Sequence, residues 1–162
     1  MRRNRTVARM RFGLALAALV AALDQLSKWA VLEIFMDPPR VIKLLPFFDL
    51  VLVYNRGASF GILNMSAQWV PWLLTGVAIV MVIALLVWLR RAENRFLAAA
   101  LGLIIGGAVG NGVDRVVRDR HAVVDFIDIY VGAYHWPAFN VADSAIVVGV
   151  FIILLDGLII RH

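Results

Sequence analysis

The hydrophobic positions of this chain fall into four long runs, and polar residues gather between the runs and near their ends. A helix that crosses the roughly 30 Å hydrocarbon core of a bilayer needs about 20 mostly apolar residues. The pattern therefore predicts four membrane-spanning helices, at about residues 12–32, 70–89, 96–113 and 142–160. The second and third runs are uncharged, whereas Asp24 and Lys28 lie inside the first and Asp143 and Asp156 inside the fourth. The first and fourth runs can span only if these charged residues lie near the membrane surfaces.

The distribution of lysine and arginine predicts how the chain crosses the membrane. The start MRRNRTVARMR, the link RRAENR and the end RH hold 9 of the 16 basic residues, whereas two longer segments, at about 34–69 and 114–141, hold 6. Because basic residues stay on the cytoplasmic side of membrane proteins, we expect both termini in the cytoplasm and both longer segments outside it. The basic start also fits a cleavable signal peptide with VAA at 20–22 as its cleavage site, but the apolar run resumes after Asp24 and favours an uncleaved helix.

The first of the longer segments has the composition of a small β element. Residues 41–63, VIKLLPFFDLVLVYNRGASFGIL, mix β-branched and aromatic residues with one proline and two glycines. This composition predicts one or two short strands, a turn and then a short helix, lying on the outer membrane surface. The predicted fold class is an all-α integral membrane protein with a single domain, residues 1–162, and four transmembrane helices. A small periplasmic or extracytoplasmic β element and loop are expected to cover the site.

Three glycines mark one face of the third run. Gly102, Gly106 and Gly110 recur at four-residue spacing. Small residues at this spacing let helix backbones approach closely in membranes. We expect a packing face here and no functional site.

The overall composition agrees with a membrane protein and narrows the chemistry. The chain is 62% hydrophobic and 17% charged, whereas a soluble domain is about half apolar and about a quarter charged. The absence of cysteine excludes disulfides, thiolate nucleophiles, cysteine-ligated zinc and iron–sulfur clusters, and the protein cannot itself carry a lipidated cysteine. The net charge of +5 does not indicate nucleic-acid binding, because the basic residues are not spread over a soluble face.

The polar residues of the apolar runs converge on one layer of the membrane. At about 1.5 Å of rise per residue, the charged pair of the first helix lies in its outer half. The third helix ends, and the fourth begins, at the outer side, and a loop between them carries one more acid. The residues of this layer are Asp24, Lys28, Asn111, Asp114, Arg115, Asp125 and Asp143. Charged groups inside a bilayer are costly, rare and usually functional.

Asp125 and Asp143 are the strongest candidates for chemistry. They stand 18 positions apart, and a loop of that length can turn back and bring them together. Two carboxylates that share a site do not ionise together easily, so one of them keeps a proton near neutral pH. The charged carboxylate can then take a proton from water while the protonated one polarises a carbonyl group. This is the chemistry of an aspartic protease, which uses no metal and no covalent intermediate.

The other acids have simpler interpretations. Asp24 with Lys28 could be a neutralising pair, and Asp114 with Arg115 could be solvated at the interface. Asp128 is expected to be a solvated loop residue. Asp156 is near the cytoplasmic end of the fourth run, where it is expected to pair with one of three arginines. These are Arg11, Arg90 and Arg161.

Four motifs contain most of these polar residues. They are DQLSK at 24–28, YNRGASFGIL at 54–63, GNGVDR at 110–115, and VVDF at 123–126 followed by FNVAD at 139–143. Their content and order resemble the bacterial lipoprotein signal peptidases (signal peptidase II), and the resemblance covers nearly the whole chain. It implies an aspartyl endopeptidase of the bacterial cytoplasmic (inner) membrane that removes signal peptides from diacylglyceryl-modified prolipoproteins. Such enzymes cut just before the lipidated cysteine, and the antibiotic globomycin targets them.

The resemblance also implies roles for single residues. Asp125 and Asp143 match the catalytic dyad of the family. The positions that match substrate-binding or site-supporting residues are Asp24, Lys28, Asn55, Gly57, Asn111, Arg115, Asn140 and Ala142. No metal and no cofactor is expected, and the expected partners are diacylglyceryl-prolipoprotein substrates and membrane lipid, with no nucleic acid and a monomeric enzyme. Because Asp143 begins a helix, where the dipole favours negative charge, we expect Asp143 to be ionised and Asp125 protonated.

Other classes of protein use similar residues. A small proton- or cation-coupled transporter also needs intramembrane acids, but those lie at the midplane and the fold usually contains an inverted repeat. In a structural subunit, the polar residues would join helices to one another. A metal hydrolase is poorly supported, because His121 and His135 have no ligand spacing to each other.

Overall fold

The computed structural model describes residues 2–57 and 69–159. Its long helices are α1 (Arg2–Ala30), α2 (Val70–Leu89), α3 (Arg95–Val117) and α4 (Val141–Ile159), and a short π-helical turn, η1 (Val31–Phe35), continues α1. The prediction of four helices long and apolar enough to cross a membrane is confirmed. The short helix expected near residue 60 and Arg161 lie outside the described residues.

Two of these helices are longer than their apolar runs. α1 begins at Arg2 and not near residue 12, so it includes the arginine-rich start of the chain. α3 continues to Val117 and does not end near residue 113, so Asp114 and Arg115 are helical. An ion pair over one turn, from Arg118 Nε to Asp114 Oδ1 at 2.9 Å, supports this extension. The apolar run therefore indicates the membrane-spanning part of α3, whereas a local contact such as this ion pair decides at which residue the helix ends.

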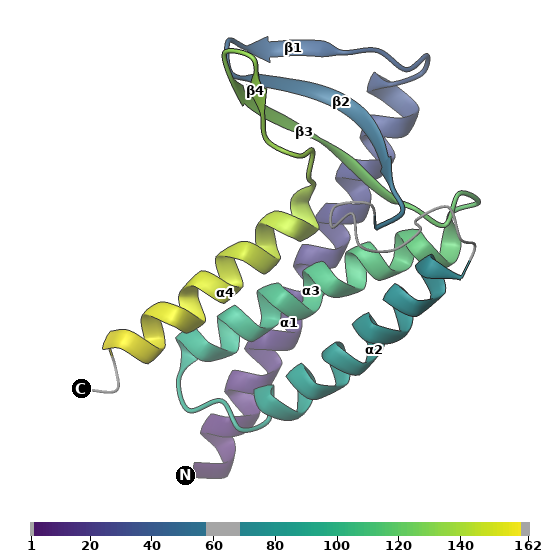
Figure 1. Ribbon diagram of the computed structural model, residues 1–162. Coiled ribbons are helices and arrows are strands. Elements are labelled where there is room, and N and C mark those ends of the chain that lie inside the picture. Colours follow the sequence, from purple (N-terminus) through teal and green to yellow (C-terminus); the bar gives the residue numbers. More distant parts are fainter. Residues whose placement is uncertain (1, 58–68, 160–162) are drawn as a thin grey trace.

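α3 is the central helix of the bundle. It packs against α1, α2 and α4 (Figure 1), and 12 of its 23 residues are buried. A Cβ atom at Gly106 would lie 2.6 Å from the carbonyl oxygen of Ala17, and one at Gly110 would lie 2.6 Å from Asp24 Oδ2. The predicted glycine face is therefore confirmed as the surface on which α1 packs.

An antiparallel sheet stands at one end of the bundle, far from both termini (Figure 1). Its strands follow one another in the order β1 (Ile42–Leu45), β2 (Phe48–Asn55), β3 (Val123–Val131) and β4 (Tyr134–His135). The first two confirm the β element predicted before α2. The expectation that Asp125 lies in a loop is wrong, because it lies in β3, whose sequence VVDFIDIYV is rich in β-branched residues.

Candidate active site

Asp125 and Asp143 come from different elements and share one hydrogen-bonding neighbour. Asp125 lies near the start of β3 and is 1% exposed, and Asp143 lies in the first turn of α4. Asn140 Nδ2 donates to Asp125 Oδ1 at 2.7 Å, and Asn140 Oδ1 accepts from the backbone N–H of Asp143 at 2.9 Å. The two aspartates predicted to pair are therefore held on the two sides of one asparagine amide.

The same asparagine also begins α4. Its side chain caps the helix by accepting from the N–H of Asp143, and its own backbone N–H donates back to Asp143 Oδ2 at 3.3 Å. This reciprocal arrangement has the form of a capping box. The contact that starts the helix thus also fixes the position of one aspartate relative to the other.

Two more amides complete the donor set around the carboxylates. Asn55 Nδ2 donates to Asp125 Oδ2 at 2.9 Å, and Asn111 Nδ2 donates to Asp143 Oδ1 at 2.7 Å. Asn55 is itself held by Gly57, whose N–H donates to Asn55 Oδ1 at 2.8 Å. Gly57 has a φ of 106°, which favours glycine at this turn. Both oxygens of Asp125 and both oxygens of Asp143 therefore accept hydrogen bonds.

The surroundings of Asp125 favour its protonated form. Burial, helped by the negative charge of Asp143, raises the pKa of Asp125 to about 6, even though the hydrogen bonds from Asn55 and Asn140 act to lower it. One carboxyl group of the pair can therefore hold a proton close to neutral pH.

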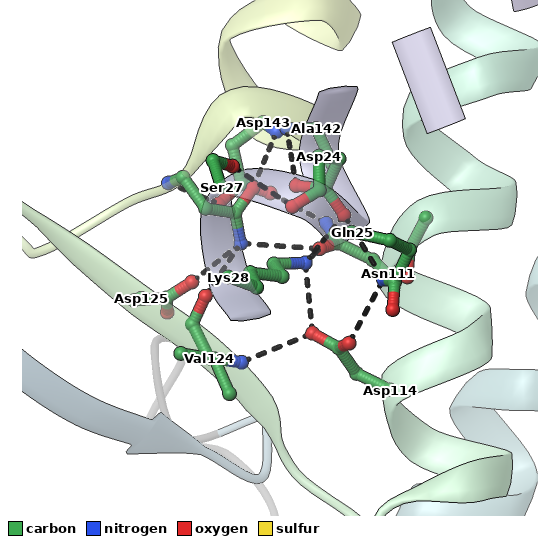
Figure 2. A network of polar contacts seen from close by, with 12 residues as sticks. Asp24, Gln25, Ser27, Lys28, Asn111, Asp114, Val124, Asp125, Ala142 and Asp143 are labelled. Atoms are coloured by element: carbon green, nitrogen blue, oxygen red, sulfur yellow. Dashed lines mark hydrogen bonds and ion pairs between the residues drawn. The ribbon is translucent and has the colours of Figure 1, made fainter. Parts of the chain in front are cut away.

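A buried ion cluster lies next to the two aspartates (Figure 2). Lys28, which is fully buried, places its Nζ 2.7 Å from Asp24 Oδ2, 2.8 Å from Asp114 Oδ2 and 3.0 Å from Asn111 Oδ1. Arg118 supplies a second positive charge to Asp114 at the edge of the cluster. With two acids and two bases the cluster is formally neutral, which a buried set of charges requires.

The two acids of this cluster hold the backbone beside the two site aspartates. Asp24 Oδ1 accepts from the N–H of Ala142 at 3.0 Å, one residue before Asp143. Asp114 Oδ2 accepts from the N–H of Val124 at 3.1 Å, one residue before Asp125. We call Asp24, Lys28 and Asp114 the ion clamp, because one lysine joins the two carboxylates that position the two backbones (Figure 2).

Two members of this arrangement were not among the predicted site residues. Asp114 was placed in the outer polar layer, with solvation at the interface left open as an alternative, and Gln25 was not singled out. Gln25 Nε2 donates to the carbonyl oxygen of Gly110 and to Asp114 Oδ1, both at 3.0 Å, and so joins α1 to α3. The available signal was their position within DQLSK and GNGVDR.

Arg115 interacts with the aspartate pair but makes no ion pair among the described residues. Its Nη1 donates to the carbonyl oxygen of Asn111 at 3.3 Å, and its guanidinium interacts electrostatically with Asp143, Asp114 and Asp125. Within the described part of the chain, its buried Nε atom has no hydrogen-bond partner. The site thus contains a cationic donor with unused capacity.

A cavity of about 640 Å³ opens beside the pair. It is lined by Asn55, Trp136, Pro137, Ala138, Phe139, Asp143, Ser144, Val147 and Val148. Val147 and Val148 belong to the exposed face of α4 and are 67% and 50% exposed. The cavity therefore runs from Asp143 to the apolar side of the bundle. In the ranges that the structure describes, no group of three or more His, Asp or Glu side chains is arranged to hold a metal ion.

The remaining acids differ from their expected settings. Asp156 accepts from Asn94 Nδ2 at 3.0 Å, and no described arginine pairs with it. Asn94 is the N-cap of α3, so the acid joins α4 to the start of α3. Asp128 is 8% exposed and lies 2.8 Å from His135 Nδ1, so the expectation of a solvated loop residue is wrong. Asp128 lies in β3, which pairs with β4, the strand that carries His135.

The fold and the site define a multi-pass membrane protein with two aspartates held together at the sheet end of a four-helix bundle. Residues 16–159 match the family described as Signal peptidase (SPase) II. The chain therefore belongs to the signal peptidase II family, which is a family of peptidases.

Individual relatives agree with this assignment. The chain is 48% identical over 148 residues to the lipoprotein signal peptidase of Cupriavidus taiwanensis, covering 90% of this chain and 81% of that protein. It is 51% identical over 142 residues to that of Azoarcus sp. (strain BH72), covering 87% and 79%. A solved bacterial membrane enzyme, determined by the in meso method at 1.9 Å resolution, is 31% identical with a TM-score of 0.78, covering 93% of this chain and 94% of that one.

Proposed function

We propose that this membrane peptidase removes the signal peptide of diacylglyceryl-modified prolipoproteins, cutting before the lipidated cysteine, and that Asp125 and Asp143 perform the hydrolysis. The observation that carries the proposal is the shared contact of both aspartates with Asn140, at 2.7 Å and 2.9 Å, beside an open cavity. The lipoprotein signal peptidases of Cupriavidus taiwanensis and Azoarcus support the substrate class.

The two aspartates take different roles in this proposal. Asp143 lies in the first turn of α4 and accepts from Asn111, so its negative charge is favoured and it acts as the general base. Asp125, with its raised pKa, carries the proton. Asp143 takes a proton from water as the water oxygen attacks the scissile carbonyl carbon, and Asp125 gives its proton to the carbonyl oxygen. The tetrahedral intermediate then collapses as its C–N bond breaks: Asp143 gives the leaving amine the proton that it took from water, and one hydroxyl of the intermediate returns a proton to Asp125.

The cavity and Arg115 complete the proposed substrate site. A signal peptide is an apolar helix in the membrane, and the exposed apolar face of α4 offers a surface along which it can reach Asp143. The unused donor capacity of Arg115 suits a backbone carbonyl of the bound peptide. The outer β loop was expected to cover the site, and residues 58–68 of that loop lie outside the described residues.

The test is cleavage of a purified diacylglyceryl-modified prolipoprotein by wild type, Asp125→Asn and Asp143→Asn. Asp128→Asn is the matched control, since it makes the same change on the same strand as Asp125 but outside the pair. We expect wild type and the control to cut before the lipidated cysteine. Both site variants should lose at least about 10³-fold in the rate of cleavage. Their unfolding temperatures should lie at most a few degrees below that of wild type.

Two results would overturn the proposal. Full activity of either site variant would remove that aspartate from the chemistry. Cleavage of the unmodified precursor as fast as the lipidated one would contradict the substrate class. A proton-coupled transporter predicts instead that the purified chain moves protons in vesicles and leaves the prolipoprotein intact.

A further inference from the structure

A second cavity lies at the other end of the bundle, far from the sheet. It has a volume of about 350 Å³ and is lined by Arg5, Ala8, Arg9, Asn94 and Arg95. We call it the arginine cavity. The lining residues come from the first turns of α1 and from the start of α3, which meet at the end of the bundle that carries the N-terminus (Figure 1). Its volume is roughly ten times the ~30 Å³ share of a water molecule, so it has room for more than solvent.

One arginine of this cavity is held in place by oxygen acceptors. Arg9 Nη1 donates to the backbone carbonyl of Glu93, and Arg9 Nε donates to that of Arg5 at 3.2 Å. A third contact joins Arg9 Nη2 to Thr6 Oγ1 at 3.5 Å. All three acceptors are uncharged, so the guanidinium is oriented while its positive charge is not neutralised.

The other two arginines also keep their charge unpaired. Among the described residues, neither the Arg5 nor the Arg95 side chain makes an ion pair, and both residues are exposed. One acid, Asp156, is hydrogen-bonded to a lining residue of the cavity. That residue is Asn94 and not an arginine. Three positive charges therefore surround one hollow, and its described lining includes no acidic side chain.

The position of the hollow relative to the apolar surface indicates its ligand. Phe12 lies four residues beyond Ala8 on α1 and is 46% exposed, and Phe96 follows Arg95 on α3 and is 69% exposed. Both residues thus leave apolar side chains exposed close to the arginines. A molecule that fits has a phosphate group at the level of the arginines and apolar chains extending from there along the bundle.

We propose that the arginine cavity binds the phosphate headgroup of an anionic glycerophospholipid. Guanidinium groups bind phosphate oxygens in bidentate pairs, and basic pockets between transmembrane helices take anionic headgroups. The site stands apart from Asp125 and Asp143 and does not depend on the proposed proteolysis. A bound lipid joins the start of α1 to the start of α3, two segments linked in this region by the contact of Arg9 with Glu93.

The test is native mass spectrometry of the purified full-length protein with an equimolar mixture of phosphatidylglycerol and phosphatidylcholine. We expect wild type to retain phosphatidylglycerol in preference to phosphatidylcholine. The double variant Arg5→Gln/Arg95→Gln leaves the bonded Arg9 unchanged and should retain phosphatidylglycerol about tenfold less. Arg11→Gln, on the same helix but outside the lining, is the matched control and should stay within twofold of wild type.

Three outcomes would contradict the proposal. An equal loss in Arg11→Gln would mean that net charge, and no defined site, holds the lipid. Equal retention of phosphatidylcholine would remove the selectivity for anionic lipid. Displacement of phosphatidylglycerol by millimolar inorganic phosphate would assign the cavity to a free anion. Cleavage assays on the same variants separate this site from the proteolytic one, because the arginine variants should still cut substrate.

Discussion

The side chain of Asn140 has three structural roles. It begins α4, it accepts from the backbone of Asp143, and it donates to Asp125. Its amide also donates to Asn111 Oδ1 at 3.1 Å and to the carbonyl oxygen of Val124 at 3.2 Å. An aspartate at this position would add a third carboxyl group beside the pair, and an alanine would leave buried acceptors unsatisfied. The contacts with the two aspartates therefore constrain the residue at position 140 as much as the cap of α4 does.

The buried carboxyl group of Asp125 should make folding stability depend on pH. Its pKa is raised from 3.8 to about 6, so the native protein binds this proton more tightly than the unfolded chain does. Wild type should therefore lose stability as pH rises from about 4 through about 6, by up to about 3 kcal/mol. Asp125→Asn lacks this titration and should gain stability relative to wild type over the same range.

Thermal unfolding in detergent between pH 4 and pH 8 checks this prediction. The quantity to compare is the difference in unfolding temperature between Asp125→Asn and wild type at each pH, because the substitution also changes one hydrogen bond. Asp128→Asn provides the control on the same strand. A difference that stays constant from pH 4 to pH 8 would show that Asp125 titrates normally.

At the scale of elements, the ion clamp connects α1, α3, α4 and β3 through one lysine. Replacing Lys28 by methionine would leave Asp24 and Asp114 buried side by side with only Arg118 as counter-charge. Removing one partner of a buried ion pair typically costs about 3–5 kcal/mol. We expect Lys28→Met to lose stability by this amount and to lower proteolytic activity, because the backbones before Asp125 and Asp143 lose their fixed acceptors.

Two further variants distinguish the effect of an unpaired buried charge from a general effect of replacing a lysine. Lys43→Met changes the only other lysine of the chain, which is exposed on β1, and should stay within about 0.5 kcal/mol of wild type. Asp24→Asn combined with Lys28→Met removes one charge of each sign and keeps an oxygen acceptor for Ala142 N–H. Chemical or thermal unfolding should show the double variant to be more stable than Lys28→Met alone. If Lys28→Met costs less than about 1 kcal/mol, the clamp does not hold the site together.

The elements differ in how far the sequence predicts them. Long apolar runs predict α2 and α4 almost to the residue, because hydrocarbon thickness sets their length. The strand β3 was missed, since its acids Asp125 and Asp128 interrupt the apolar alternation and suggested a loop. Asp125, Asp143 and Asn140 were predicted as site positions, the two aspartates from their chemistry and all three from the family motifs, and the structure brings the three together. Asp24 and Lys28 were singled out as well, but their link to Asp114 was not predicted. The meeting of Lys28 with Asp114 depends on the rotation of α1 against α3, which glycines at Gly106 and Gly110 allow and no local pattern specifies.

At the scale of the whole molecule, the protein has two chemically distinct ends. The sheet and the aspartate pair stand at one end, and the arginine-rich start of α1 and the α2–α3 link stand at the other (Figure 1). A lipoprotein precursor places its cleavage site near the outer surface of the cytoplasmic membrane, so the proposed proteolysis needs the sheet end outside. The excess of arginine at the opposite end favours the same orientation.

Labelling of single cysteines tests this orientation directly, because the natural chain contains none and its background is zero. Tyr134→Cys places a thiol on β4, at a residue that is 73% exposed, and Glu93→Cys places one in the exposed link between α2 and α3. A membrane-impermeant maleimide applied to intact spheroplasts should label Tyr134→Cys and leave Glu93→Cys unlabelled until the membrane is permeabilised. The reverse pattern would place the aspartate pair on the cytoplasmic side, where a translocated precursor could not reach it. That result would refute the proposed substrate even if the purified enzyme cut it in detergent.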